Sequence, residues 1–120
     1  MQTKAEFTNE IKQRTNAVAV QIFKFCEALP FKSVHDIAIK QIVKSSTSVA
    51  ANYRAVCRAR SKAEFFAKLS IVVEEADETI FWLEFLTEVA VFKSSFSEPL
   101  ILEMNKLTAL FATARKNTNN

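Results

Sequence analysis

The stretch that decides the fold is Ser45–Leu86, SSTSVAANYRAVCRARSKAEFFAKLSIVVEEADETIFWLEFL. It contains the end of one helical pattern and most of a second, with a basic segment between them. Ser61 and Glu64 match the S-x-x-E capping box that precedes many helices. A join as short as this one favours an antiparallel helix hairpin, so we expect two long helices side by side.

Composition indicates the same class for the whole chain. The 120 residues are 49% hydrophobic and include two prolines and no glycine. Hairpin turns and strand bulges depend on glycine, whereas a helix interior is destabilised by it. The composition therefore predicts an all-α protein, and its length suits a single domain over residues 1–120.

Apolar residues recur every three or four positions along the chain, as they do on one face of a helix. Pro30 ends the first pattern, Ser33 is expected to cap the second, and Ser97-Glu98-Pro99 is expected to begin the fourth. These signals predict helices over about 5–28, 34–59, 62–91 and 98–114. Short joins then predict an up-down-up-down antiparallel four-helix bundle.

The third predicted helix is apolar on two sides. Its core face is centred on Ala76 and includes Leu69 and Leu83, and the opposite face carries Phe81, Trp82, Phe85 and Phe92. A helix that is apolar on two sides is buried on two sides. The second contact is either another helix of the bundle or another subunit. We assign these four aromatic residues to a hypothetical oligomer interface.

Charge is distributed unevenly around this hairpin. Residues 32–68 carry a net charge of +6, and residues 69–98 carry −6. Arg54, Arg58, Arg60 and Lys62 gather at the turn between the second and third helices, and we call them the basic pole. Such clusters hold phosphate backbones largely without reading sequence. The same cations would also stabilise the negative C-terminal end of the second helix, so both interpretations stand.

The residues that could carry catalysis are few. His35 is the one histidine, which excludes a di-iron bundle with its two Glu-x-x-His pairs. Glu74, Glu75 and Glu78 form an acidic cluster, but no second Glu-x-x-Asp pair completes a magnesium hydrolase of the all-helical type. We therefore expect no enzyme, no metal and no cofactor, with a metal-dependent hydrolase as a remote alternative. Cys26 and Cys57 are expected to be buried free thiols.

Hydropathy gives an expectation about location. The longest runs without a charged residue are nine residues, Thr15–Phe23 and Ser45–Tyr53, whereas a membrane helix needs about twenty apolar residues. The segment MQTKAEFTNE lacks the apolar stretch of a signal peptide. We expect a cytoplasmic protein that does not engage a membrane.

The stretch Ser48–Leu86 resembles the small four-helix bundle proteins encoded by intervening sequences within 23S ribosomal RNA genes. The matching pattern comprises Ser-[Val/Ile]-x-x-Asn, an Arg/Ser-x-x-Glu-Phe turn and Glu-Ala-x-Glu followed by Trp-Leu. In this chain it is formed by Ser48, Val49, Asn52, Ser61, Glu64, Phe65, Glu75, Ala76, Glu78, Trp82 and Leu83. Arg54 departs from the family, whose members commonly carry Glu there, so an acid–base pairing usual in the family is rearranged here.

The resemblance implies an up-down bundle that assembles as a ring, typically a homopentamer. A related branch, the accessory proteins of diversity-generating retroelements, is similar in its bundle and binds RNA and a reverse transcriptase through basic surface. The resemblance thus implies self-association, with RNA or a nucleic-acid enzyme as a further partner. The main hypothesis is a non-enzymatic oligomer that binds nucleic acid through the basic pole. The alternative is an assembly module without nucleic-acid binding.

Overall fold

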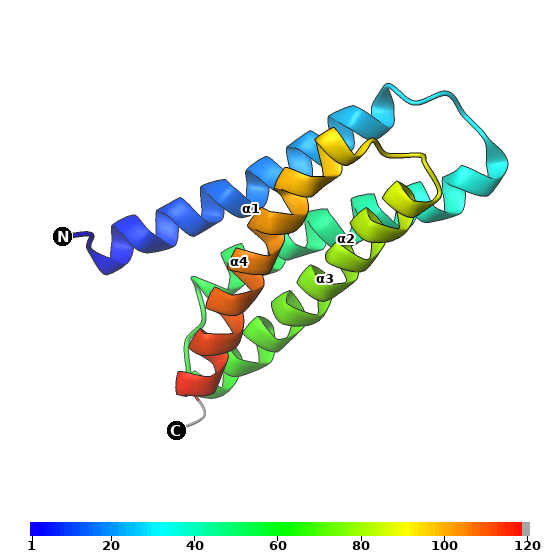
Figure 1. Cartoon of the computed structure of the whole chain (residues 1–120). Coiled ribbons are helices and arrows are strands. Elements are labelled where there is room, and N and C mark those ends of the chain that lie inside the picture. Colours follow the sequence, from blue (N-terminus) through cyan, green and yellow to red (C-terminus); the bar gives the residue numbers. More distant parts are fainter. Residues whose placement is uncertain (119–120) are drawn as a thin grey trace.

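The computed structural model describes residues 1–118 and contains four long helices in this part of the chain. They are α1 (Lys4–Glu27), α2 (Ser33–Val56), α3 (Lys62–Glu88) and α4 (Ser94–Thr118). No strand occurs among the described residues. Successive helices run in opposite directions (Figure 1), so the predicted all-α, up-down-up-down bundle is confirmed.

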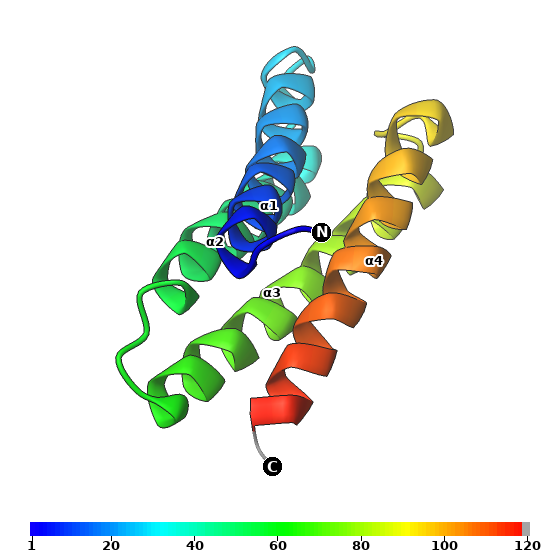
Figure 2. The ribbon, with the colours of Figure 1, turned by 90° about the vertical axis from the view of Figure 1, so that its left-hand side faces the viewer.

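The helices are not packed equally. α3 packs against both α2 and α4, α1 packs against α2, and α1 touches α4 only sparsely. Figure 2 shows α1 and α2 on one side of the molecule and α3 and α4 on the other. The N-terminal half of α1 diverges from the C-terminal half of α4 (Figure 1). The bundle is therefore more open at this end than at the other.

Side-chain caps begin two of the helices. The hydroxyl of Ser61 accepts a hydrogen bond of 3.0 Å from the backbone N–H of Glu64, which confirms the predicted start of α3. The hydroxyl of Thr3 accepts the equivalent bond from Glu6 at the start of α1, also at 3.0 Å. The second cap was not foreseen, although Thr3 and Glu6 have the same S/T-x-x-E spacing.

The bounds of α2 differ from the prediction at both ends. Ser33 is its first helical residue and Lys32 precedes it without a side-chain cap, so the proposed Ser33 cap is wrong. The helix ends at Val56, and residues 57–61 form the join to α3. Three residues that were expected to be helical, 57–59, therefore belong to the turn.

α4 begins at Ser94, several residues before the predicted start. The carbonyl of Lys93 accepts the backbone N–H groups of Phe96 and Ser97, at 2.9 and 3.0 Å. Ser97 is fully buried, donates its hydroxyl to the Lys93 carbonyl and accepts a 2.7 Å bond from Thr87. Ser97 thus links α4 to α3 instead of capping α4, and Pro99 lies inside the helix.

The core is apolar, and besides the Thr87–Ser97 contact a hydroxyl pair joins α3 to α2 within it. Ile22, Ile42, Leu83 and Leu107 are among the side chains with no exposed surface. In the middle of α2, small residues allow α3 to approach closely, and the hydroxyl of Thr79 donates to Ser45 at 3.0 Å. The single proton of the Thr79 hydroxyl is shared with the carbonyl oxygen of Glu75, 2.8 Å away, and the Ser45 hydroxyl donates to the carbonyl of Ile42 at 3.3 Å, so both buried hydroxyls have partners.

Phe92 corrects one of the proposed interface residues. It was placed on the back of the third helix, but α3 ends at Glu88 and Phe92 lies beyond it, 2% exposed. Its ring packs edge-on against Phe25 and Phe96, with centroids 5.2 and 5.3 Å apart. The rings of Phe25 and Phe96 stack at 4.0 Å. Phe92 therefore belongs to the core, because the chain leaves the helical repeat before reaching it.

Candidate nucleic-acid interface

The basic pole lies at the end of the molecule where α2 joins α3. Arg54 is in the last turn of α2, Arg58 and Arg60 are in the join, and Lys62 is the first residue of α3. All four side chains are exposed. A five-residue connection therefore brings the predicted residues to the same end of the bundle.

Few of these cations are neutralised within the subunit. Arg60 lies 3.6 Å from the carboxylate of Glu64, and its side chain is 88% exposed. Such an exposed pair contributes little to stability. Within residues 1–118, Arg54, Arg58 and Lys62 form no ion pair and no side-chain hydrogen bond to the carbonyls at the end of α2. The helix-capping interpretation thus has no direct bond to support it.

The C-terminal end of α4 adds cations that were not assigned from the sequence. A shallow hollow is lined by Arg60, Lys62 and Phe65 on one side and by Asn117 and Thr118 on the other. The last turn of α4, which carries Arg115 and Lys116, therefore lies beside the pole. The signal that could have found them is the topology, because α4 of an up-down bundle ends where α2 joins α3.

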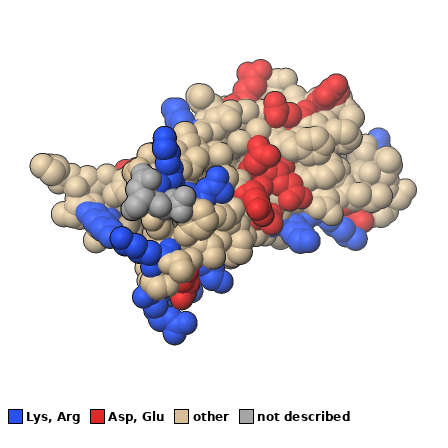
Figure 3. All heavy atoms as spheres, turned by 90° about the horizontal axis from the view of Figure 1, so that it is seen from below, with Lys and Arg blue, Asp and Glu red and all other residues tan. Residues whose placement is uncertain are grey.

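The charges are distributed unevenly over the surface of the molecule. Figure 3 shows Lys and Arg side chains around one end of the bundle, a group of Asp and Glu side chains further along, and other Lys and Arg side chains beyond that group. The cations at this end come from the basic pole and from the last turn of α4, whereas Glu74, Glu75 and Glu78 lie near the middle of α3. A polyanion that approaches this end meets cations before it meets the acidic side chains.

The acidic cluster of α3 does not assemble a metal site in the described part of the chain. Among residues 1–118, no three His, Cys, Asp or Glu side chains are placed to hold a metal ion. Burial raises the pKa of Glu75, as do the charges of Glu78 and Glu74, while the Lys44 amine opposes the shift. The electrostatic neighbours of Glu75 thus include Lys44, one of the partners expected for a structural role.

The remaining interface residues form what we call the aromatic patch, Phe81, Trp82 and Phe85. Phe81 and Phe85 are 52% and 40% exposed, so no other helix of the bundle covers them. Trp82 is half-buried and packs edge-on against both, with centroids 4.9 and 5.6 Å apart. In residues 1–118, its buried indole Nε1–H has no hydrogen-bond acceptor.

α2 extends this apolar surface. Val34 and Ile37, in its first two turns, are 74% and 68% exposed. Together with Trp82, Phe85 and Val89 they line a groove of about 340 Å³. The apolar surface is therefore shared by two helices, and the α2 side was not foreseen because Val34 and Ile37 lie off its core stripe.

The two thiols are free, as predicted, but only partly buried. Cys26 packs against the core, and burial raises its pKa to about 11. At neutral pH it is therefore a protonated thiol, which is a poor nucleophile and a poor metal ligand. His35 is half-buried at the start of α2, beside the groove of the aromatic patch.

The fold and this surface define a small all-helical bundle with a cationic end and an exposed aromatic side. The family model of the 23S rRNA-intervening sequence protein matches residues 8–113. The chain belongs to this family. The resemblance of Ser48–Leu86 to the family is thereby confirmed and extends over nearly the whole bundle.

A solved structure gives the same result for the fold. It is a protein of unknown function from the S23 ribosomal protein family of Bacteroides thetaiotaomicron VPI-5482. Sequence identity is 30%, the TM-score is 0.80, and the match covers 88% of this chain and 98% of that one. No curated protein matches the chain. None of the helices within residues 1–118 has the length and hydropathy to cross a membrane.

Proposed function

We propose that this protein is a non-enzymatic oligomer that binds nucleic acid, and RNA in particular, through the basic pole. The observation that carries the proposal is the set of exposed cations at the α2–α3 join, three of which have no ion-pair partner within residues 1–118. Lys116 of α4 adds a further exposed charge beside them. A phosphate backbone supplies the anions that the subunit itself does not.

RNA is the first polyanion to test because the names of the related proteins refer to ribosomal RNA and to the ribosome. The chain belongs to the family of the 23S rRNA-intervening sequence protein, and the solved neighbour belongs to the S23 ribosomal protein family. The physical basis is general, since clusters of Lys and Arg bind phosphates by releasing condensed counterions, and affinity then falls steeply with salt.

The test is the salt dependence of binding to a structured RNA, measured by fluorescence anisotropy. The variant R54Q/R58Q/K62Q removes three cations of the pole and leaves the Arg60–Glu64 pair intact. We expect weaker binding and a salt slope that is smaller by about two to three units, because each lost phosphate contact reduces the slope by about 0.9.

The matched control is K24Q/K32Q/K93Q, whose exposed lysines lie at the opposite end of the bundle. Both variants lower the formal net charge by the same amount from its value of +3. We expect the control to bind RNA nearly as well as the wild type. Equal losses in the two variants, or no binding by the wild type at low salt, would overturn the proposal.

A second function is supported by the aromatic patch. We propose that Phe81 and Phe85 contact a neighbouring copy of this chain, with Val34 and Ile37 beside them, in a ring that the resemblance suggests is a pentamer. The exposure of these four side chains supports the proposal, because contiguous apolar surface on a folded protein commonly marks an interface. Assembly without nucleic-acid binding remains the alternative function, and the RNA experiment separates the two.

A further inference from the structure

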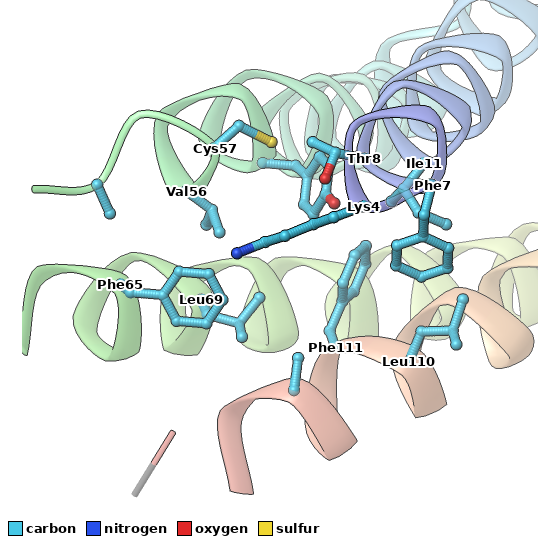
Figure 4. A pocket seen from close by; sticks show the side chains of 13 residues that line it. Lys4, Phe7, Thr8, Ile11, Val56, Cys57, Phe65, Leu69, Leu110 and Phe111 are labelled. Atoms are coloured by element: carbon cyan, nitrogen blue, oxygen red, sulfur yellow. The ribbon is translucent and has the colours of Figure 1, made fainter. Parts of the chain in front are cut away.

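A cavity of about 300 Å³ lies at the open end of the bundle, where α1 diverges from α4. Every helix contributes to its wall. Its aromatic lining consists of Phe7 from α1, Tyr53 from α2, Phe65 from α3 and Phe111 from α4. Figure 4 shows the lining side chains on these helices around the space, with the side chain of Lys4 extending into it.

The polar atoms of the cavity are few and lie mostly on α1. In Figure 4 the side chain of Lys4 extends across the space, and its amine points toward the side of the cavity lined by Val56 and Phe65. Lys4 forms no ion pair within residues 1–118. Thr8 and Tyr53 add hydroxyl groups to the wall. Burial raises the pKa of Tyr53, so its phenol remains a protonated donor at neutral pH.

The cavity adjoins the hollow of the basic pole. Ala59 and Phe65 line both spaces, the cavity on one side and the hollow with Arg60 and Lys62 on the other. An apolar space with aromatic walls therefore adjoins an exposed cationic surface. A ligand that fits both must carry a planar apolar group and an anion a short distance apart.

We propose that this cavity receives one unstacked base of a single-stranded RNA, while its flanking phosphates lie on Arg60 and Lys62. This inference rests on the proposed function and sharpens it, because it specifies single-stranded RNA and a base-binding position. Bases stack on aromatic side chains irrespective of sequence, while cations beside them follow the backbone. A base that enters the cavity displaces the side chain of Lys4, whose amine can then donate to acceptors on the edge of the base, as can the hydroxyl of Thr8 in the wall.

The volume is consistent with one base. About 300 Å³ is at the lower end of the range for ligand pockets, and it suits a single planar ring system. The cationic rim also distinguishes this cavity from the groove beside the aromatic patch, whose lining residues include no Lys or Arg.

The first test needs no protein variant. Wild-type protein is titrated with a fluorescently labelled single-stranded oligonucleotide and with an abasic oligonucleotide of the same length and phosphate number. We expect the strand with bases to bind about tenfold more tightly, from the stacking of one base. The two salt slopes should agree, because the phosphate contacts are the same. Equal affinities for the two strands would overturn the inference.

The second test fills the cavity. Ala114 lines it, so A114F places a ring in the space without changing a charge, whereas A109F places the same ring on an exposed part of α4. We expect A114F to lose the preference for strands with bases and to keep its affinity for the abasic strand. The control A109F should retain the preference. Circular dichroism and melting curves establish that each variant is folded.

If A114F does not fold, T8L fills part of the same space from α1 and takes its place. A filled variant that keeps the full preference for bases would overturn the inference. The outcomes also separate the two proposals. If the pole variant loses affinity but the wild type does not distinguish the two strands, only the base-binding position fails. If the wild type binds neither strand at low salt, nor the structured RNA, the proposed function itself fails.

Discussion

At one end of the bundle, Phe25, Phe92 and Phe96 fill the space between α1 and α4, whereas at the other end the same two helices diverge and leave a cavity. The filled end lies on the side of the aromatic patch, and the open end lies beside the basic pole (Figure 1). Close packing is the rule in protein interiors, and voids are few. Where a small bundle leaves a volume unfilled beside unpaired cations, binding is the function to test first.

Between the two ends, α1 and α4 are held by a polar contact. The guanidinium of Arg14 donates to both carboxylate oxygens of Glu103, at 2.9 and 2.6 Å. Arg14 also lies 3.5 Å from Glu10 on its own helix. Because α1 otherwise contacts α4 sparsely, this bidentate pair is a principal link between the two helices.

The largest effect on stability is expected from removing an aromatic side chain from the filled end. F92A removes a buried ring that contacts two other rings, and we expect it to lower the free energy of unfolding by about 3–5 kcal/mol. The control F31A, at a residue 80% exposed near the same end, should cost less than about 0.5 kcal/mol. Urea unfolding followed by circular dichroism measures both. Similar losses in the two variants would contradict the core position of Phe92.

A charge in the aromatic patch is expected to act on assembly instead of folding. F81E places a carboxylate on a residue that is 52% exposed, so the isolated subunit tolerates it, but a copy packed against it does not. We expect association at least about 30-fold weaker, the effect of losing a contact worth about 2 kcal/mol. Sedimentation velocity at several concentrations measures it.

The matched control for F81E is L102E on α4, where the residue is 58% exposed and belongs to neither the patch nor its groove. This variant should sediment like the wild type. A wild type that is monomeric at micromolar concentration would contradict the proposed ring. An F81E variant that assembles normally would show that Phe81 does not lie in the interface.

The contact between α1 and α4 predicts a dependence of stability on pH. The hydrogen bonds and charge of Arg14 hold the pKa of Glu103 below its ordinary value of 4.5. A carboxyl whose pKa is lowered by folding stabilises the protein above that ordinary value, and this contribution is lost as pH falls through the lowered one. We therefore expect E103Q to be less stable than the wild type by about 1 kcal/mol near pH 7, with the difference disappearing in acid.

The control for E103Q is E84Q, at an exposed carboxyl of α3 that forms no ion pair in the described residues. It should change neither the stability nor its pH profile. Melting temperatures measured between about pH 7 and pH 3 compare the three proteins. A loss in E103Q that is the same at every pH would show that the contact acts through packing and not through charge.

The sequence was most informative where one local rule decides the structure. The capping box at Ser61 placed the start of α3 correctly, and the absence of glycine together with apolar periodicity predicted the four helices. It was misleading where tertiary contacts override local preference. Ser97-Glu98-Pro99 has the residue pattern of a helix start. However, Ser97 is buried against Thr87, and α4 begins before it, at Ser94.

The candidate site was predicted in part for the same reason. Arg54, Arg58, Arg60 and Lys62 are neighbours in the chain, so their grouping could be read directly. Arg115 and Lys116 reach the pole through the arrangement of α4, and the cavity depends on the divergence of α1 and α4, which no spacing encodes. The sequence pattern predicts Phe92 on the back face of the third helix because the apolar periodicity continues past Glu88. The structure differs because α3 ends there and the backbone changes direction.

The smallest predicted effect on stability concerns Ala90, the residue at which the backbone changes direction after α3. Ala90 has φ of 61°, the left-handed conformation that usually requires glycine at the end of a helix. The N–H of Val91 donates to the carbonyl of Leu86 and that of Ala90 to Thr87, at 2.9 and 3.0 Å, which is the Schellman pattern. This pattern ends α3 and directs Phe92 into the filled end, so it is retained despite the strain of a Cβ atom.

We expect A90G to relieve that strain and raise the free energy of unfolding by about 0.5–1 kcal/mol, since the gain is partly offset by the greater freedom of glycine in the unfolded chain. The control A109G, at an exposed residue within α4, should lower it by about 1 kcal/mol, because glycine destabilises a helix interior. Urea unfolding of both variants measures the sign as well as the size. A loss in both would show that Ala90 does not hold the left-handed conformation in solution. The position of Phe92, and with it the contrast between the filled and open ends, would then need another explanation.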